Sequence, residues 1–303
     1  MLEQKQILIE NLYSKQKIRA IVRQAILDAY KDGLTDKINH AIDLIWEYTR
    51  KTYSYDSKNR RIGELRASDK FDPEQVVIDI LTVVMPVHGN QTIQTVVSAV
   101  APTLGMVDEL DAVKCASEMV AVACESDLYD LIAPNNSETG SLMICGKYEL
   151  SDDVQQDIAD RFYIPPMIAP PKHVKSNWEC GYHTFNSHVV LKPYNAHNEP
   201  QALDVINLSN SVAYSLSEHI LAYEEESKNP LDTPEKLKNF QRMCVASRKV
   251  YDMILSNGNK FWHDHKYCSR GREYVQGYHV NIQSGSYKRA LVDFYEKEIV
   301  ELD

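Results

Sequence analysis

The sequence lacks long apolar runs, internal repeats and dense cysteine patterns. No run of about 18 apolar residues occurs in the 303 residues, so no transmembrane helix is expected. The first residues, MLEQKQILIENLYSKQK, have no continuous apolar core, and no secretory signal is expected from them. Six cysteines at irregular spacing favour reduced thiols over a disulfide framework.

Positive charge is also scarce in the chain as a whole, but it is concentrated in one region. The formal net charge is −10, which argues against a protein that coats nucleic acid with its whole surface. Residues 234–290, however, contain eleven Lys and Arg but only four Asp and Glu. Their local charge is +7, which leaves −17 for the rest of the chain. A basic face on an acidic body is suited to binding a phosphate backbone along one groove.

The most informative stretch runs from Phe261 to Phe294. It interleaves basic side chains with aromatic rings, a combination that suits a phosphate backbone with stacked bases. Gly271 separates two arginines and permits close approach of the backbone to a phosphate. The alternative is a basic surface loop with ordinary buried tyrosines. The basic and aromatic residues are Lys266, Arg270, Arg272, Lys288 and Arg289, with Trp262, Tyr267, Tyr274, Tyr278 and Tyr287.

Apolar periodicity predicts a mainly α fold, or α+β with a few short strands. The pattern predicts two helices within residues 1–50, a polar loop over 51–70, and a helix that begins at Asp72-Pro73-Glu74 and ends at Pro86. Further helices are expected over 92–101, 108–131, 151–162, 203–221 and 233–255, with short strands at 141–145 and near Tyr148. Four prolines between residues 165 and 171 require an extended connector.

The order of residues in the basic stretch resembles a known family. Cys268-Ser269-Arg270-Gly271-Arg272, then Tyr274, Asn281 and Arg289-Ala290-Leu291, is similar to the D/T-x-x-G-R block of the single-subunit, phage- and mitochondrial-type RNA polymerases. In that family the loop holds the template strand and the RNA–DNA hybrid beside the active site. The resemblance implies such a role for Gly271 and Arg272. Cys268 departs from the family, because it stands where the family has Asp or Thr.

Two weaker matches extend the resemblance. The Pro-rich segment 163–172, followed by Gly181-Tyr182, resembles the family's V-P-P segment and Gly-aromatic turn, and the 203–221 segment carries Asn207, Ser209 and Ala213 at positions of a family helix. The resemblance implies a helical N-terminal domain (1–162), a Pro-rich connector (163–200), shortened thumb-like helices (201–260), and a template-binding loop with the start of the palm (261–303). The implied nucleic-acid-binding residues are Lys172, Lys266, Arg270, Gly271, Arg272, Tyr274, Lys288 and Arg289; none is expected to be catalytic or to bind metal.

The catalytic motifs of the family do not occur in the sequence. It contains neither the H-D-D triplet nor the R-x-x-x-K-x-x-x-x-Y-G helix, and it ends about thirty residues after Arg272. It is therefore similar to the small subunit of the two-polypeptide branch found in N-four-like phages. The resemblance implies a DNA-directed RNA polymerase subunit that is inactive alone, in the cytoplasm of an infected bacterium. The implied partners are template DNA, nascent RNA and a large subunit that holds Mg²⁺, with no membrane.

Two other classes remain open. His263, His265 and Cys268 form an H-x-H-x-x-C cluster that could bind Zn²⁺, although a fourth ligand is not nearby in sequence. The chain could also be a stand-alone single-stranded nucleic-acid-binding protein. If the large subunit exists, we expect apolar residues to form a permanent interface with it, namely Met85, Val87, Tyr267, Tyr278, Phe294 and Ile299.

Overall fold

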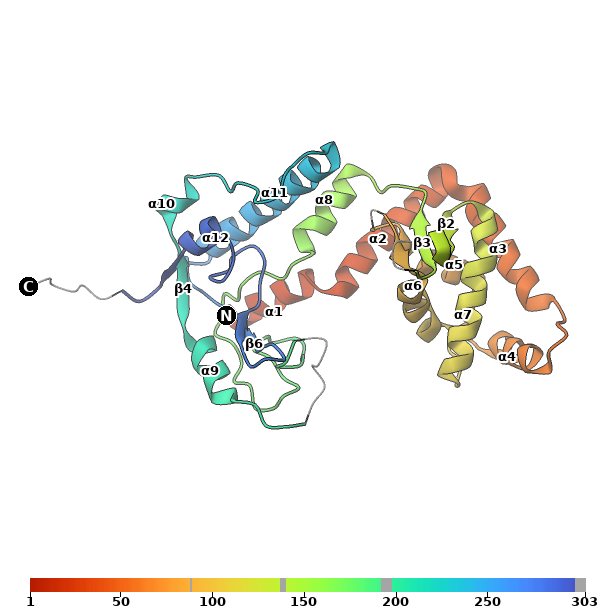
Figure 1. The fold of residues 1–303 in the computed structure, drawn as a ribbon, viewed down its shortest axis with the longest axis horizontal. Coiled ribbons are helices and arrows are strands. Elements are labelled where there is room, and N and C mark those ends of the chain that lie inside the picture. Colours follow the sequence, from red (N-terminus) through yellow and green to blue (C-terminus); the bar gives the residue numbers. More distant parts are fainter. Residues whose placement is uncertain (88, 137–139, 192–197, 298–303) are drawn as a thin grey trace, which may run out of the picture. The chain divides into compact units, whose positions relative to one another are not determined.

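The computed structural model describes residues 1–87, 89–136, 140–191 and 198–297 (Figure 1). The chain is about 54% helical, with a few short antiparallel strands, which confirms the predicted mainly α or α+β class. It divides into two compact units, Arg19–Gln155 (the middle unit) and Met1–Ile18 with Gln156–Asp303 (the composite unit). The first 18 residues thus belong with the C-terminal half of the chain.

Helices dominate the middle unit. They are α2 (Lys15–Ala29, which starts in the composite unit), a π-helical turn (Tyr30–Leu34), α3 (Thr35–Arg50), α4 (Asp56–Ala67), α5 (Pro73–Val84), α6 (Ile93–Val100) and α7 (Glu109–Ala123). Helix α3 packs against α5 and α7, and α6 packs against the same two helices (Figure 1). Asp72 caps α5 by accepting a hydrogen bond from Glu74 N at 3.1 Å, as the sequence predicts. Fully buried apolar side chains form the core, including Ile26, Ile38, Ile45, Ile80, Leu81 and Met119.

A small sheet completes the middle unit. Its strands lie in the order β1 (Gln91–Thr92), β3 (Met143–Gly146), β2 (Tyr129–Ile132), with antiparallel pairing throughout. Strand β3 matches the strand expected at 141–145. The helix expected over 108–131 is too long, because α7 ends at Ala123 and β2 follows a short 3₁₀ turn (Cys124–Ser126). Tyr148 lies outside any strand.

The loop predicted at 51–70 is wrong, since its central part is helix α4. Ile62 and Leu65, three residues apart, are buried on one face of this helix. Arg60 pairs with Asp111, and Arg61, which is also buried, pairs with Glu118; both carboxylates are on α7. These long-range contacts stabilise a helix that the polar composition obscures, because helix stability in proteins comes mostly from tertiary packing.

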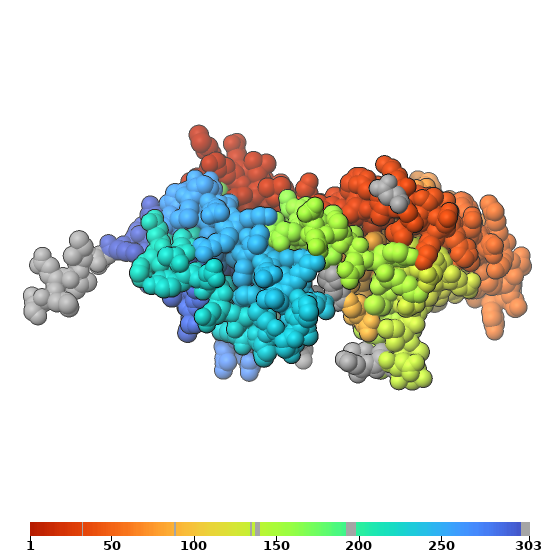
Figure 2. Space-filling view, turned by 90° about the horizontal axis from the view of Figure 1, so that it is seen from above, coloured from red at the N-terminus to blue at the C-terminus, as the bar shows by residue number. Residues whose placement is uncertain are grey.

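The composite unit contains α1 (Leu2–Leu12), α8 (Asp152–Arg161, which starts in the middle unit), α9 (Leu203–Ser211), α10 (Glu218–Leu221), α11 (Pro234–Ser256) and α12 (Ser286–Ala290). One sheet has the order β5 (Phe261–Trp262), β4 (Ala213–Leu216), β8 (Val292–Phe294), and a hairpin pairs β6 (His265–Tyr267) with β7 (Glu273–Val275). Helix α11 confirms the helix expected over 233–255. In Figure 2, α11 (blue) and the preceding residues 222–232 (teal) lie next to each other on the surface.

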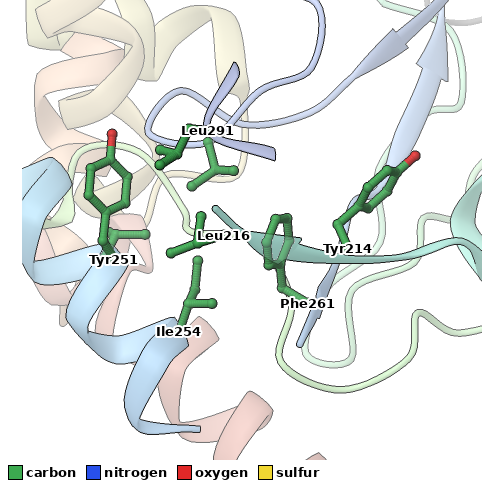
Figure 3. Packing of buried hydrophobic residues seen from close by; sticks show 8 residues of the cluster. Tyr214, Leu216, Tyr251, Ile254, Phe261 and Leu291 are labelled. Carbon is green, nitrogen blue, oxygen red and sulfur yellow. The ribbon is translucent and has the colours of Figure 1, made fainter. Parts of the chain in front are cut away.

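The single helix predicted over 203–221 is wrong, because the chain turns into strand β4 after Ser211. Tyr214 and Leu216 are buried while Ala213 and Ser215 are not, which is the alternation of a strand. Asn259 holds Leu216 at both backbone groups, donating to its carbonyl at 3.0 Å and accepting from its N–H at 2.8 Å. Figure 3 shows the resulting core between α11 and the sheet, with Tyr214, Leu216, Tyr251, Ile254, Phe261 and Leu291.

Residues 163–172 of the Pro-rich connector form no helix, as predicted, and they are buried from Pro165 to Ala169. Met167 and Trp262 exchange backbone hydrogen bonds of 2.9 and 2.8 Å. Two buried polar residues of α1 explain why the chain's start belongs to this unit. Gln6 Oε1 accepts from Ile168 N at 2.8 Å, and the Glu10 carboxylate accepts from the backbone of residues 183 and 184.

Candidate nucleic-acid interface

The residues that resemble the D/T-x-x-G-R block form the tip of the β6–β7 hairpin. Cys268 N donates to Arg272 O at 2.8 Å, and Gly271 N donates to Cys268 O at 2.9 Å, which closes the turn. Gly271 has φ +74°, a left-handed conformation that glycine adopts without steric cost. The turn therefore needs glycine at the position where the family pattern has it.

Arg270, Gly271 and Arg272 are all exposed at this tip. Neither guanidinium has an ion-pair partner among the residues that the structure describes. A guanidinium offers five N–H donors in a planar fork that matches two phosphate oxygens. The tip thus presents two groups with the chemistry to bind a phosphate backbone.

Lys266 and Tyr274 lie directly opposite each other on the hairpin and share one of its faces. Both side chains are half-buried. The Lys266 ammonium donates to Ser187 Oγ at 2.5 Å, so it is oriented by the loop that precedes α9. The opposite face, with Tyr267 and Val275, is buried against the protein.

A buried polar network fixes the base of the hairpin. Asp264 Oδ1 accepts from Gly181 N at 2.8 Å and from Asn210 Nδ2 at 3.3 Å, and Asn210 Oδ1 lies 2.8 Å from His265 Nδ1. Burial raises the pKa of Asp264, although these hydrogen bonds oppose the shift. The network joins β6 to the Gly181 turn and to α9, which lies beside β6 (Figure 1). No sequence pattern marks Asn210 or Asp264 for this role, because their partners are distant in the chain.

The other three predicted contact residues are not gathered at the tip. Lys288 is only 5% exposed, and its ammonium donates to Tyr278 O at 2.7 Å, lies 3.8 Å from the Tyr278 ring centroid and lies 3.7 Å from Glu225. Burial lowers the pKa of Lys288. Its charge is therefore used inside the protein. Arg289 is exposed near the end of α12, and Lys172 is half-buried in the connector.

The H-x-H-x-x-C spacing does not assemble a metal site. His263 is buried and its ring centroid lies 6.5 Å from that of His265, which is already bonded to Asn210, while Cys268 lies at the hairpin tip. Across residues 1–87, 89–136, 140–191 and 198–297, no group of three or more His, Cys, Asp or Glu side chains could hold a metal ion. Burial and the neighbouring His265 lower the pKa of His263 to about 3.

The apolar residues expected at a partner interface are only partly exposed. Met85 and Tyr267 are buried within the chain, so their assignment to an interface is wrong; their side chains complete local cores instead. Val87 and Tyr278 are exposed, and Phe294 on edge strand β8 is 64% exposed. Ile299 lies outside the described residues.

The fold and site together define a mainly α protein with a basic, outward-facing β-hairpin. No helix within the described ranges has the length and apolar character needed to cross a membrane. A scan against protein-family models found no match, and a search of curated proteins found none either.

Proposed function

We propose that this chain is the small subunit of a phage-encoded, DNA-dependent RNA polymerase and that its hairpin tip holds the template strand. The observation that carries the proposal is the exposed Arg270-Gly271-Arg272 turn, held by a buried network at its base. The residue order Gly271-Arg272, then Tyr274, supports the assignment because it resembles the polymerase block. Lys172 and Arg289 would contribute further contacts to the strand or to the RNA–DNA hybrid.

The chemistry of this role is positioning rather than bond making. Arg272 would bind a phosphate through two parallel charge-assisted hydrogen bonds, and the glycine before it lets the backbone approach. Mg²⁺ and the catalytic aspartates would belong to a large partner subunit. The proposed location is the cytoplasm of the infected bacterium.

The test is template-dependent RNA synthesis by this chain together with its large partner, which we expect to be encoded in a neighbouring gene. One lost charge-assisted hydrogen bond removes about 1.5–3 kcal/mol, so Arg272→Ala should weaken template binding about ten- to a hundred-fold. Arg272→Lys should also impair binding, because an ammonium cannot reproduce the planar fork.

The matched control is Lys15→Ala, which removes an exposed positive charge elsewhere in the composite unit. The subunits of the Arg272 variants should still assemble, because the tip faces solvent in this chain. Full-length RNA from Arg272→Ala at the wild-type yield would contradict the proposed role of the hairpin.

A stand-alone, single-stranded nucleic-acid-binding protein is the second candidate, because the same exposed arginines would serve it. Co-expression with the neighbouring genes followed by a pull-down separates the two functions. Recovery of a chain that carries the H-D-D motif supports the polymerase. Oligonucleotide binding with no such partner at micromolar concentration supports the stand-alone protein.

A further inference from the structure

A hollow of about 360 Å³ lies in the composite unit, between the Pro-rich connector, helix α9 and the β5–β4 sheet. Its lining contains Lys172 and His173 from the connector, Ser211 at the end of α9, and Lys260 and Trp262 around β5. All of these residues belong to one compact unit. The hairpin tip does not contribute to the lining, so this is a different place on the protein.

The charge of the hollow favours an anion. Its lining contains two ammonium groups and one imidazole, but only one carboxylate, that of Glu296. Neither Lys172 nor Lys260 forms an ion pair with any residue in the described part of the chain. The Lys260 ammonium instead lies 5.3 Å from the Trp262 ring centroid and 4.2 Å from that of Tyr295. These cation–π contacts orient the charge without neutralising it.

The walls are built by contacts that leave little freedom to the backbone. Lys172 N donates to Gly181 O at 2.8 Å, Asn207 Oδ1 accepts from Val174 N at 2.8 Å, and Tyr295 N donates to Ala213 O at 3.0 Å. Lys172 therefore projects from a fixed position, which reduces the ordering cost of binding a ligand.

The remaining lining indicates what accompanies the anion. Pro170, Pro171, Ala213 and Trp262 supply apolar surface, and Ser211 and Asn207 supply polar groups. A volume near the lower end of ordinary ligand pockets, about 300–1,000 Å³, suits a ligand of nucleotide size. We infer that this hollow binds one nucleotide unit, with its phosphate between the ammonium groups of Lys172 and Lys260.

The choice of a nucleotide over another phosphate ester rests on the proposed function. The same chemistry could come from a free nucleoside triphosphate or from one residue of a single strand. The two sources are distinguished by titrating the purified chain with ATP and, separately, with a fluorescein-labelled single-stranded oligodeoxynucleotide.

The central variant is Lys172→Ala/Lys260→Ala, and its matched control is Lys15→Ala/Lys17→Ala, which removes two exposed charges from the same unit. We expect the central variant to bind the probe at least tenfold more weakly and the control to bind like the wild type. If the probe is the oligonucleotide, the slope of log affinity against log salt should also fall by about 0.7 for each phosphate that the variant no longer neutralises.

A second variant tests the shape of the hollow without changing its charge. Ser211 lies at the exposed end of α9 and lines the hollow, so Ser211→Tyr adds a large ring to its wall. It should weaken binding of the same probe while leaving the unfolding temperature close to that of the wild type. Thermal unfolding of every variant shows whether the fold is retained.

The outcomes separate this site from the hairpin. Weakened binding in Lys172→Ala/Lys260→Ala together with Ser211→Tyr supports the site, whatever Arg272→Ala does. Wild-type binding in both variants overturns it, even if Arg272→Ala abolishes binding and so supports the hairpin. Displacement of the probe by inorganic phosphate as readily as by ATP overturns the assignment to a nucleotide.

Discussion

At the scale of single residues, Cys268 decides between two interpretations of the hairpin tip. Its Sγ accepts a hydrogen bond from Arg270 N at 3.4 Å, and this contact is the first cause that lowers the pKa of the thiol. An Asp or Thr side chain at the same position could accept that hydrogen bond. Cys268 therefore departs from the Asp or Thr of the polymerase pattern but still provides the hydrogen-bond acceptor that supports the turn.

We predict that Cys268→Thr has template binding and RNA synthesis close to those of the wild type, because the hydroxyl oxygen replaces Sγ as acceptor. Cys268→Val, of similar size but without an acceptor, should weaken binding by disordering the turn. The measurements are oligonucleotide affinity and the metal content of each protein. Stoichiometric zinc in the wild type that is lost in Cys268→Ser would instead support the zinc-stabilised alternative.

Gly181 packs closely against the base of the hairpin. A Cβ atom there would lie 2.7 Å from Pro171 Cβ and 2.9 Å from Asp264 Oδ1. We predict that Gly181→Ala lowers the free energy of unfolding by about 1–3 kcal/mol, the usual cost of overpacking. Denaturant titration of the purified chain measures the change.

The control is Gly63→Ala, which adds the same methyl group inside helix α4 where no atom lies within 4 Å. It should raise the free energy of unfolding by about 0.5–1 kcal/mol through helix propensity. A Gly181→Ala protein as stable as the wild type would show that the close contact at the hairpin base does not constrain the fold.

At the scale of elements, a buried histidine lies in each of the two segments that flank the hairpin. His263 lies between β5 and β6, and His279 lies between β7 and α12, with its Nδ1 2.9 Å from Ser247 Oγ of α11. Burial is the first cause that lowers the pKa of both rings, to about 3 for His263 and about 4 for His279. Both are therefore neutral in the folded protein at pH 7.

These shifts predict acid lability of the composite unit. In the unfolded chain a histidine is protonated as the pH falls through about 6.5. In the folded chain His263 and His279 stay neutral until the pH falls to about 3 and about 4. The stability contributed by neutral histidine is complete above about pH 6.5 and is lost as the pH falls toward 4 and 3. At pH 5, His279 alone should account for on the order of 2 kcal/mol of lost stability.

Denaturant titrations at pH 7 and pH 5 measure this loss, with His279→Gln as the comparison. The variant lacks the titrating group, so its stability should fall less between the two pH values, although it starts lower. An equal fall in both proteins would show that other groups cause the acid lability.

At the scale of the whole molecule, the charge pattern and the missing motifs predict a protein that binds a strand but does not copy it. The sequence contains no H-D-D triplet, and the described residues contain no group of carboxylates suited to metal binding. We predict that the purified chain, with Mg²⁺, ribonucleotides and a primed single-stranded template, makes no RNA. The proposed division of roles between two subunits would be refuted if this chain alone incorporated labelled nucleotide. The activity would have to persist through purification and be lower in Arg272→Ala.

The amino-acid sequence by itself determined the features that depend on local chemistry. Asp72-Pro73 starts α5, Thr233-Pro234 starts α11, and four prolines keep residues 165–171 out of a helix, because capping and the fixed φ of proline act over a few residues. The mainly α class follows from the same local periodicity. The glycine turn with its two arginines could also be located from residue order alone.

Only the tertiary structure decided what depends on distant partners. Helix α4 forms where the polar sequence predicts a loop, because Arg60 and Arg61 find carboxylates on α7. The sequence predicts that Lys288 is an exposed cation, but its ammonium is buried beside Glu225 and the backbone carbonyl of Tyr278. Residues 213–216 leave the helical pattern because β5 and β8 lie on either side, and sheet pairing between segments this far apart in the chain is not encoded in local periodicity.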